Sequence, residues 1–145
     1  MSDEILEIGS IRITRLAQWQ IQALEALIFA TRDQGVGILQ ITTKFRDEIN
    51  PQQDHSHIQK LAFEFAGIAD ASKVDTIDTK EEGGVKSARF SLERGGTVDV
   101  YWYKLTPQGL ILAAYKAEKS EGEKEQIRNE IEECDLLVGS VQFAD

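Results

Sequence analysis

The sequence has few of the residues that carry chemistry outside a hydrophobic core. It contains one cysteine, Cys134, two histidines, His55 and His57, and two prolines among 145 residues. A single thiol cannot form an internal disulfide, so no oxidising compartment is implied. The amino terminus lacks the basic and apolar regions of a secretion signal, and no apolar run approaches the ~18 residues of a membrane span. These absences predict a cytoplasmic protein with no membrane partner.

Basic residues are also in the minority. Lys and Arg total 16 against 25 Asp and Glu, which gives a formal net charge of −9. Nucleic acids select clustered Lys and Arg, and the chain has no such cluster, so we predict no nucleic-acid partner. No internal repeat, low-complexity tract or Pro/Gly/Ser linker divides the sequence, which predicts a single domain over residues 1–145.

The amino-terminal third of the chain favours strands. Residues 4 to 15 alternate loosely between apolar and polar side chains, which fits one or two short strands broken near Gly9 and Ser10. Residues 16 to 28 match both a helical and an extended spacing, so both remain open there, although we favour extended structure from Ala26 to Arg32. A turn at residues 33–37 and a β-rich segment at 38–45 complete a predicted hairpin.

The rest of the chain predicts two helices around a meander. Asn50 and Pro51 open a helix that ends near Gly67 or Asp70. Residues 74–115 form a meander with glycine-containing turns at about every eleventh to thirteenth residue. Ser120 and Glu123 form a possible capping box for a second helix, and Val138–Phe143 resembles a final strand. The predicted fold class is α+β: an antiparallel sheet of about six or seven strands with two main helices packed on it.

Motifs for catalysis or cofactor binding are missing. The sequence has no C-x-x-C, H-E-x-x-H, G-x-S-x-G or Walker-type glycine motif. His55 and His57 are two residues apart on a predicted helix, so their rings diverge, and the simplest interpretation is two solvated histidines. The second predicted helix has an apolar stripe of Ile127, Ile131, Cys134 and Leu137. Cys134 lies on this stripe among acidic neighbours, which favours a buried thiol over a nucleophile. We therefore predict no catalytic residue, no metal and no cofactor.

The aromatic run Tyr101-Trp102-Tyr103 is the strongest candidate for a binding surface. On a strand, Trp102 shares a face with Val98 and Val100, while Tyr101 and Tyr103 share the opposite face. The face of Trp102 is the more apolar, so we expect it to cover the helices and the tyrosines to stand on an exposed face. Tyrosine is common in recognition surfaces. We list Tyr101, Tyr103, Arg89 and Arg94 as tentative binding residues.

The order of elements resembles the Mog1/PsbP-like fold family, which includes Mog1, PsbP and bacterial DcrB-type proteins. The matching pieces are Trp19, Gly37–Ile41, Ala113–Tyr115 and Leu137–Phe143. The resemblance implies binding proteins, adaptors and chaperones without a shared active site, and it carries over no catalytic residue. The chain lacks a transit or lipoprotein signal, which argues against a PsbP or DcrB role.

Three classes of function remain. The first is a non-enzymatic protein-binding module, an adaptor or a chaperone- or immunity-like protein, that acts through the exposed sheet face. The second is a small-molecule-binding protein or enzyme with a pocket between sheet and helices, which Tyr115, Trp19 and His57 could reach. The third is a homodimer formed through a sheet face or edge.

Overall fold

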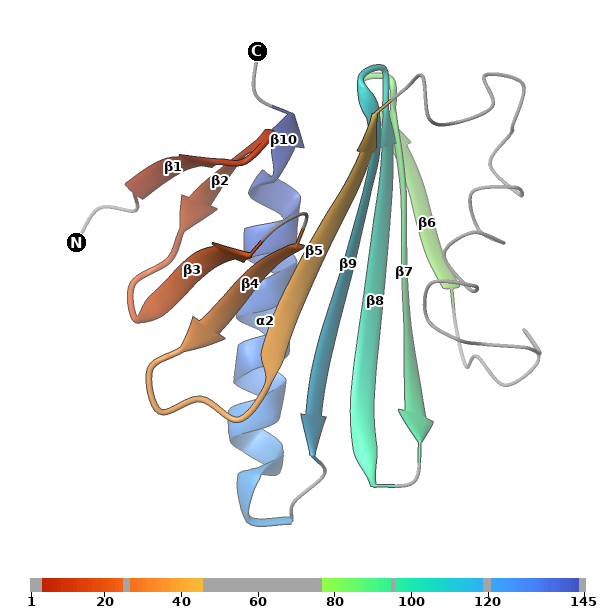
Figure 1. Ribbon diagram of the computed structural model, residues 1–145. Helices are drawn as coiled ribbons and strands as arrows, with labels where there is room; N and C mark the ends of the chain where they lie inside the picture. The colour runs from red at the N-terminus through yellow and green to blue at the C-terminus, as the bar shows by residue number, and fades with distance from the viewer. Residues whose placement is uncertain (1–3, 25–26, 46–76, 95, 119–120, 144–145) are drawn as a thin grey trace.

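The computed structural model describes residues 4–24, 27–45, 77–94, 96–118 and 121–143. In these ranges the chain is mostly antiparallel sheet with one α-helix (Figure 1). The elements in chain order are β1 (Glu4–Ile8), β2 (Ile11–Arg15), β3 (Trp19–Leu24), β4 (Leu27–Arg32), β5 (Ile38–Phe45), β6 (Ile77–Glu82), β7 (Val85–Arg94), β8 (Thr97–Thr106), β9 (Gly109–Glu118), the 3-10 turn η3 (Glu121–Glu123), α2 (Lys124–Ser140) and β10 (Gln142–Phe143). The prediction of two main helices is therefore supported for one helix only, because the predicted helix after Asn50 lies outside the described residues.

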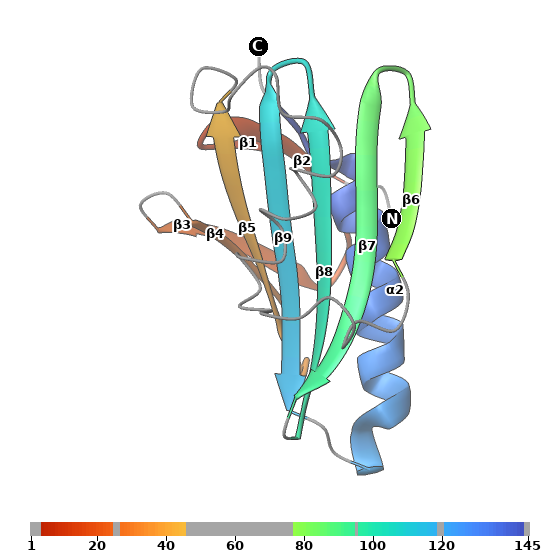
Figure 2. The same ribbon diagram turned by 90° about the vertical axis from the view of Figure 1, so that its right-hand side faces the viewer.

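The strands form two sheets. The larger sheet has the order β3-β4-β5-β9-β8-β7-β6, and the smaller has the order β1-β2-β10. All of these neighbours pair antiparallel, so the predicted meander is confirmed from β6 to β9. The pairing of β5 with β9 joins the amino-terminal hairpins to the meander. Figure 2 shows the long strands of the larger sheet side by side, with α2 across one of its faces.

The ambiguous residues after Leu16 form strands rather than a helix. Trp19 pairs with Arg32 and Leu24 with Leu27 in the hairpin of β3 and β4. Trp19 is buried and Ile21 half-buried, whereas Gln20 and Gln22 are exposed. This period of two is that of a strand with one buried face. Pairing with β4 therefore decides the structure where the helical and extended spacings were equal.

One core lies between the larger sheet and α2. The predicted helix stripe is confirmed: Ile127, Cys134 and Leu137 are buried, and Ile131 packs against them partly buried. Val100 and Trp102 belong to the same cluster, so the expected inward face of β8 is also confirmed. The smaller sheet contributes Ile11 and Ile13 from β2. Burial of this shared apolar surface holds the two sheets and the helix together.

The two ends of α2 differ from the sequence prediction. α2 begins after the N-cap residue Glu123, which makes no side-chain cap hydrogen bond; the predicted capping box involves Ser120, which lies outside the described residues. At the other end α2 continues through Ser140, so the expected final strand is reduced to β10. The Lys104 ammonium donates to the carbonyl oxygens of Val138, Gly139 and Val141 at 3.1, 3.3 and 2.8 Å.

These bonds explain the longer helix. The last carbonyl groups of a helix lack intrahelical donors and need partners from elsewhere. Lys104 supplies them from β8. The Ser140 hydroxyl adds a further link, because it donates to Leu137 O at 2.7 Å and accepts from the backbone N–H of Thr14 at 3.0 Å. The end of α2 is thus bonded to both sheets.

Gly37 marks a close approach of the β4–β5 connection to the core. A Cβ atom at this position would overlap the ring of Tyr115, whose side chain is fully buried. The neighbouring N–H groups of Val36 and Gly37 both donate to the carboxylate of Glu130 on α2, at 2.8 and 3.0 Å. Only glycine allows this backbone to pass so close to the tyrosine.

We expect Gly37→Ala to lower the free energy of unfolding by about 1–3 kcal/mol, because the added methyl group forces the buried ring or the strand to move. The matched control is Gly139→Ala. Its Cβ would meet no atom within 4 Å in the last turn of α2. Chemical denaturation of both variants measures the effect. Equal stability of Gly37→Ala and the wild type would contradict the close approach.

Candidate functional site

The two tyrosines of the aromatic run are buried. Tyr101 is 1% exposed and Tyr103 0%, so the expectation of an exposed tyrosine face is wrong. The ring of Tyr101 stacks on Phe90 with centroids 5.2 Å apart, and its hydroxyl donates to Asp99 Oδ2 at 2.9 Å. Burial raises the pKa of Tyr103 to about 12. The face of the sheet opposite α2 is therefore a second buried layer.

The predicted binding residues do not converge on one site. Arg89 pairs with Trp102 across β7 and β8, which places it on the α2 side of the sheet, opposite Tyr101 and Tyr103. Arg94 is the last residue of β7, and its side chain lies outside the described part of the chain. A binding role for these residues stays a prediction, and among them Arg89 has the half-exposed position that a ligand can reach.

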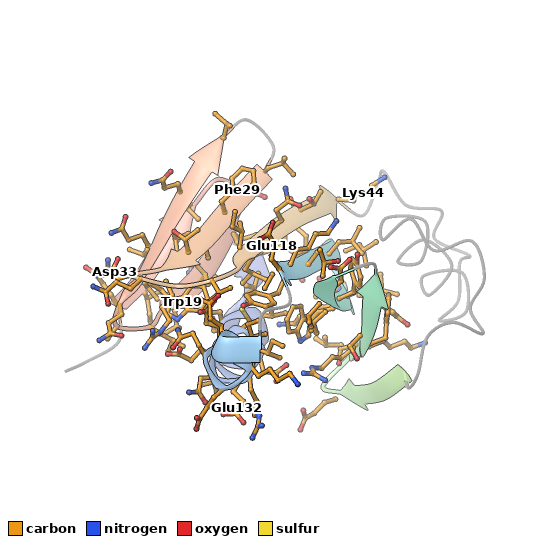
Figure 3. The ribbon with its side chains drawn as sticks, turned by 90° about the horizontal axis from the view of Figure 1, so that it is seen from below. Trp19, Phe29, Asp33, Lys44, Glu118 and Glu132 are labelled. Carbon is orange, nitrogen blue, oxygen red and sulfur yellow. The ribbon has the colours of Figure 1, made fainter. Side chains whose placement is uncertain are left out.

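Two of the residues expected to reach a pocket between sheet and helices, Trp19 and Tyr115, are buried in the core. Trp19 is 1% exposed and Tyr115 is 0% exposed, and both belong to the cluster beneath α2. His57 lies outside the described residues. Figure 3 shows Trp19 on the side of α2 toward β3 and β4, and Glu132 on the far side of the helix. Trp19 and Tyr115 therefore build the core rather than a ligand pocket.

Glu130 is a buried carboxylate at the centre of this region. It accepts hydrogen bonds from the Tyr115 hydroxyl at 2.9 Å and from the side-chain amide of Gln126 at 2.8 Å, besides the two from Val36 and Gly37. Burial alone would raise its pKa, but these four donors outweigh burial and hold the pKa of Glu130 below its ordinary value of 4.5. Its oxygens are occupied and fully buried, which makes it a structural anchor rather than a general acid or base.

Cys134 has the environment of an inert thiol. Its side chain is fully buried, as the sequence predicted. Burial raises the pKa of the Cys134 thiol, and the negative charges of Glu130, Asp135 and Glu133 raise it further. A thiol needs the opposite setting to act as a nucleophile. Within the described ranges, no group of three or more His, Cys, Asp or Glu side chains could hold a metal ion.

A groove beside α2 is an open concave surface that a ligand could occupy. It encloses about 1390 Å³ and separates α2 from the β7 side of the larger sheet. Its lining comes from α2 between Lys124 and Gly139, from β7 between Val85 and Arg89, and from β8 between Val98 and Thr106, with Gln142 and Phe143 at one end. We call this surface the α2–β7 groove. In the view along the strands, β6 lies well to one side of α2 (Figure 3).

The groove follows from the alternation of side chains along β7. Ser87 and Arg89 face the α2 side, while Ala88 and Phe90 are buried on the opposite side with the tyrosines. Polar side chains on the inner face of β7 give α2 little apolar surface to cover. One helix is about 10 Å wide and spans about two strands spaced roughly 4.8 Å apart, so this part of the sheet stays uncovered.

The lining of the groove contains a bonded trio of side chains. Asp135 Oδ1 accepts a hydrogen bond from Arg89 Nε at 2.8 Å and another from Trp102 Nε1 at 2.9 Å. The guanidinium carbon of Arg89 lies 5.9 Å from the centroid of the Trp102 ring, within range of a cation–π contact. The three residues come from β7, β8 and α2, so the trio also ties the helix to the sheet.

The charge of the groove differs from that of the whole chain. Five basic residues line it, Arg12, Arg89, Lys104, Lys124 and Arg128, against three acidic ones, Glu82, Glu132 and Asp135. The chain as a whole carries a formal charge of −9. An excess of basic residues in one concave surface of an acidic protein favours anionic groups over cationic ones.

Sequence reasoning identified Arg89 and a pocket between sheet and helices, but it missed Asp135 and assigned Trp19, Tyr115 and His57 to the pocket instead of residues of β7. The signal was present in Ser87-Ala88-Arg89-Phe90-Ser91, where small or polar residues alternate with apolar ones. This pattern indicates that one face of β7 is buried and the other is not. The apolar face of Trp102 indicated the inward face of β8 correctly, but the middle of β8 is buried on both faces, so it gave no sign that the inner face of β7 is open.

The comparisons with known proteins identify the fold. The Saccharomyces cerevisiae Ran-binding protein Mog1p is 10% identical with a TM-score of 0.65, covering 100% of this chain and 97% of that chain. A mutant of the protein Mog1 gives the same values. Cyanobacterial PsbP from Synechocystis is 9% identical with a TM-score of 0.62, covering 99% and 93%. No protein-family model matches the chain, and no curated protein matches it in sequence.

The chain therefore has the Mog1/PsbP-like fold, as the resemblance implied. At these identities the likeness establishes the fold and not the function. Membership of the DcrB type stays a prediction. In the described part of the chain, no helix is long and apolar enough to cross a membrane.

Glu130 gives a testable dependence of stability on pH. We expect Glu130→Gln to lower the free energy of unfolding by about 1–3 kcal/mol at neutral pH, because an amide cannot accept all four hydrogen bonds. The folded-state pKa is lowered, so the stabilisation is complete above the unfolded value and disappears as pH falls through the folded value. The difference between variant and wild type should therefore shrink in acid.

Denaturation curves between neutral pH and strong acid measure this difference. Glu132→Gln, at an exposed position of the same helix, is the matched control and should show little change. A stability gap between Glu130→Gln and the wild type that is constant with pH would contradict an ionised Glu130.

Proposed function

We propose that residues 1–145 form a single-domain, cytoplasmic, non-enzymatic protein-binding module, an adaptor or a chaperone- or immunity-like protein, that holds a segment of its partner in the α2–β7 groove. The observation that carries this proposal is the groove itself, with its volume of about 1390 Å³ between a helix and an uncovered part of the sheet. It replaces the exposed tyrosine face that the sequence suggested.

The dimensions of the groove support a polypeptide ligand. Its helical wall extends from Lys124 to Gly139, which corresponds to about 22 Å at 1.5 Å per residue. An extended peptide covers that length with about seven residues. Pockets for small molecules usually enclose about 300–1,000 Å³. A long groove open at the surface therefore favours a protein segment over a small molecule or substrate.

The lining of the groove has the composition of a recognition surface. Trp102 and Arg89 are part of it, and Trp and Arg are enriched at the sites that dominate binding energy. Val98, Ile127 and Ile131 add apolar surface beside them. The fold is compatible with this role, because a yeast protein that shares it is a Ran-binding protein.

A variant that fills the groove tests the proposal. We expect Ser87→Trp, on the groove side of β7, to abolish capture of the partner from a lysate of the native host, because the indole occupies the space for the ligand. Gln22→Trp, at an exposed position of β3 outside the groove, is the matched control and should capture the partner as the wild type does. Mass spectrometry of the retained proteins gives the result.

The other outcomes separate the alternatives. Equal capture by the wild type and both variants would contradict a role for the groove. Loss of capture with Gln22→Trp alone would place the interface at the β3 edge. Light scattering of the purified chain shows whether the partner is a second copy. Thermal melts of each variant confirm that it is folded before capture is compared.

A further inference from the structure

The guanidinium group of Arg89 is held in one position but only partly used. Its Nε–H donates to Asp135 Oδ1, and its carbon lies over the Trp102 ring. Among the described residues, neither of its two amino groups has a hydrogen-bond partner. A guanidinium carries five N–H donors, so four of them remain for a ligand. The Arg89 side chain is 35% exposed and lines the α2–β7 groove, which makes these donors accessible.

Asp135 and Trp102 organise Arg89 before any ligand binds. Trp102 is 6% exposed and bonds Asp135 through its indole nitrogen, so the carboxylate that orients the arginine is itself fixed. Binding normally costs about 0.5–1.5 kcal/mol for each long side chain that becomes immobile. The bond to Asp135 and the contact with Trp102 already restrict the Arg89 side chain, so much of this entropy is lost before the ligand binds. Bidentate arginine contacts to carboxylates are strong and geometrically specific.

The other basic residues that line the groove are either bonded to other groups or exposed. Lys104 is engaged with the carbonyl groups at the end of α2, and Arg12 is paired with Glu7 at 3.1 Å. Lys124 and Arg128 are exposed near the start of α2. Among the basic residues that line the groove, Arg89 is thus the ordered and accessible cation, and the apolar Ile131 and Trp102 line the same groove. This arrangement fits one acidic side chain among apolar neighbours better than a polyanion, which needs several clustered cations.

We propose that Arg89 is the specificity-determining residue of the groove, and that it binds the carboxylate of an Asp or Glu in an extended segment of the partner protein. The inference rests on the proposed function and adds the chemistry of the partner. The carboxylate accepts two N–H bonds from the amino groups of Arg89, while Asp135 keeps the Nε–H. Apolar residues on either side of the acidic residue lie against Ile131 and Val98.

The test uses the full chain as bait for a phage-displayed library of random peptides of about ten residues. We expect the selected peptides to share an Asp or Glu at one position, flanked by apolar residues. Their synthetic forms should perturb the indole N–H signal of Trp102 in nuclear magnetic resonance spectra. Peptide affinity should fall by about 10- to 100-fold with Arg89→Gln, which is the loss expected for a charge-assisted hydrogen-bonded pair.

Two controls make the result specific to Arg89. Arg15→Gln removes the same charge from β2 outside the groove and should leave affinity unchanged. Changing the shared acidic residue of the peptide to its amide should cost as much as Arg89→Gln, and the two changes together should cost no more than either alone. Such non-additivity is the signature of a direct contact, which a merely structural role of Arg89 does not produce.

The outcomes separate this inference from the proposed function. Selected peptides that lose binding with Ser87→Trp but carry no shared acidic residue would overturn the role of Arg89 and leave the groove intact. Peptides whose binding is unaffected by Ser87→Trp, or a library that yields no binder, would overturn both. Selection of phosphate-bearing ligands in preference to carboxylates, shown by competition with inorganic phosphate at equal concentration, would also overturn the assignment.

Discussion

The carboxylate of Glu130 fixes where α2 lies on the sheet. It is fully buried, and three of its four hydrogen bonds join the helix to Tyr115 on β9 and to the backbone that enters β5, while the fourth comes from Gln126 on α2 itself. An ion buried in this way is costly unless every lone pair is used, so the helix has one position in which the charge is satisfied. The trio of Arg89, Trp102 and Asp135 and the bonds of Lys104 then attach the helix to β7 and β8.

The same attachment explains why the groove is open. α2 is held toward β9 and β5 by Glu130, and it covers the apolar residues of β8. α2 meets β7 through the Arg89–Asp135 pair, and the inner face of β7 presents Ser87 and Arg89 where a core would need apolar groups. The position of α2 and the polar inner face of β7 therefore agree, and together they leave this part of the sheet uncovered. The space left over is the candidate site.

Much of the fold could be predicted from local patterns. Glycine-containing turns located the hairpins of the meander, and the stripe of Ile127, Cys134 and Leu137 located the buried face of α2. Three of the residues that carry the resemblance to the fold family have a structural role. Gly37 packs against the ring of Tyr115, and both donate a hydrogen bond to Glu130. The Ser140 hydroxyl accepts a hydrogen bond from the backbone of β2. Residues 19–24 could not be assigned, because their strand depends on pairing with β4.

The site was harder to predict than the fold. The burial of Tyr101 and Tyr103 could have been predicted from the neighbouring strand β9. Its residues from Gly109 to Tyr115 form a long apolar run, which indicates a strand buried on both faces, and all of them are buried. The role of Asp135 could not be predicted from the sequence. Asp135 is one of several acidic residues in its stretch, and no local pattern shows which of them bonds an arginine 46 residues earlier in the chain. Such pairs follow from the topology of the sheet and not from spacing.

The distance in sequence between the two walls of the groove has a consequence for biosynthesis. β7 leaves the ribosome well before α2, and without α2 a nascent chain has Arg89 but neither Asp135 to orient it nor a second wall beside it. The groove can therefore exist only after the carboxy-terminal helix has docked. A partner that recognises the groove distinguishes completed molecules from truncated or half-folded ones.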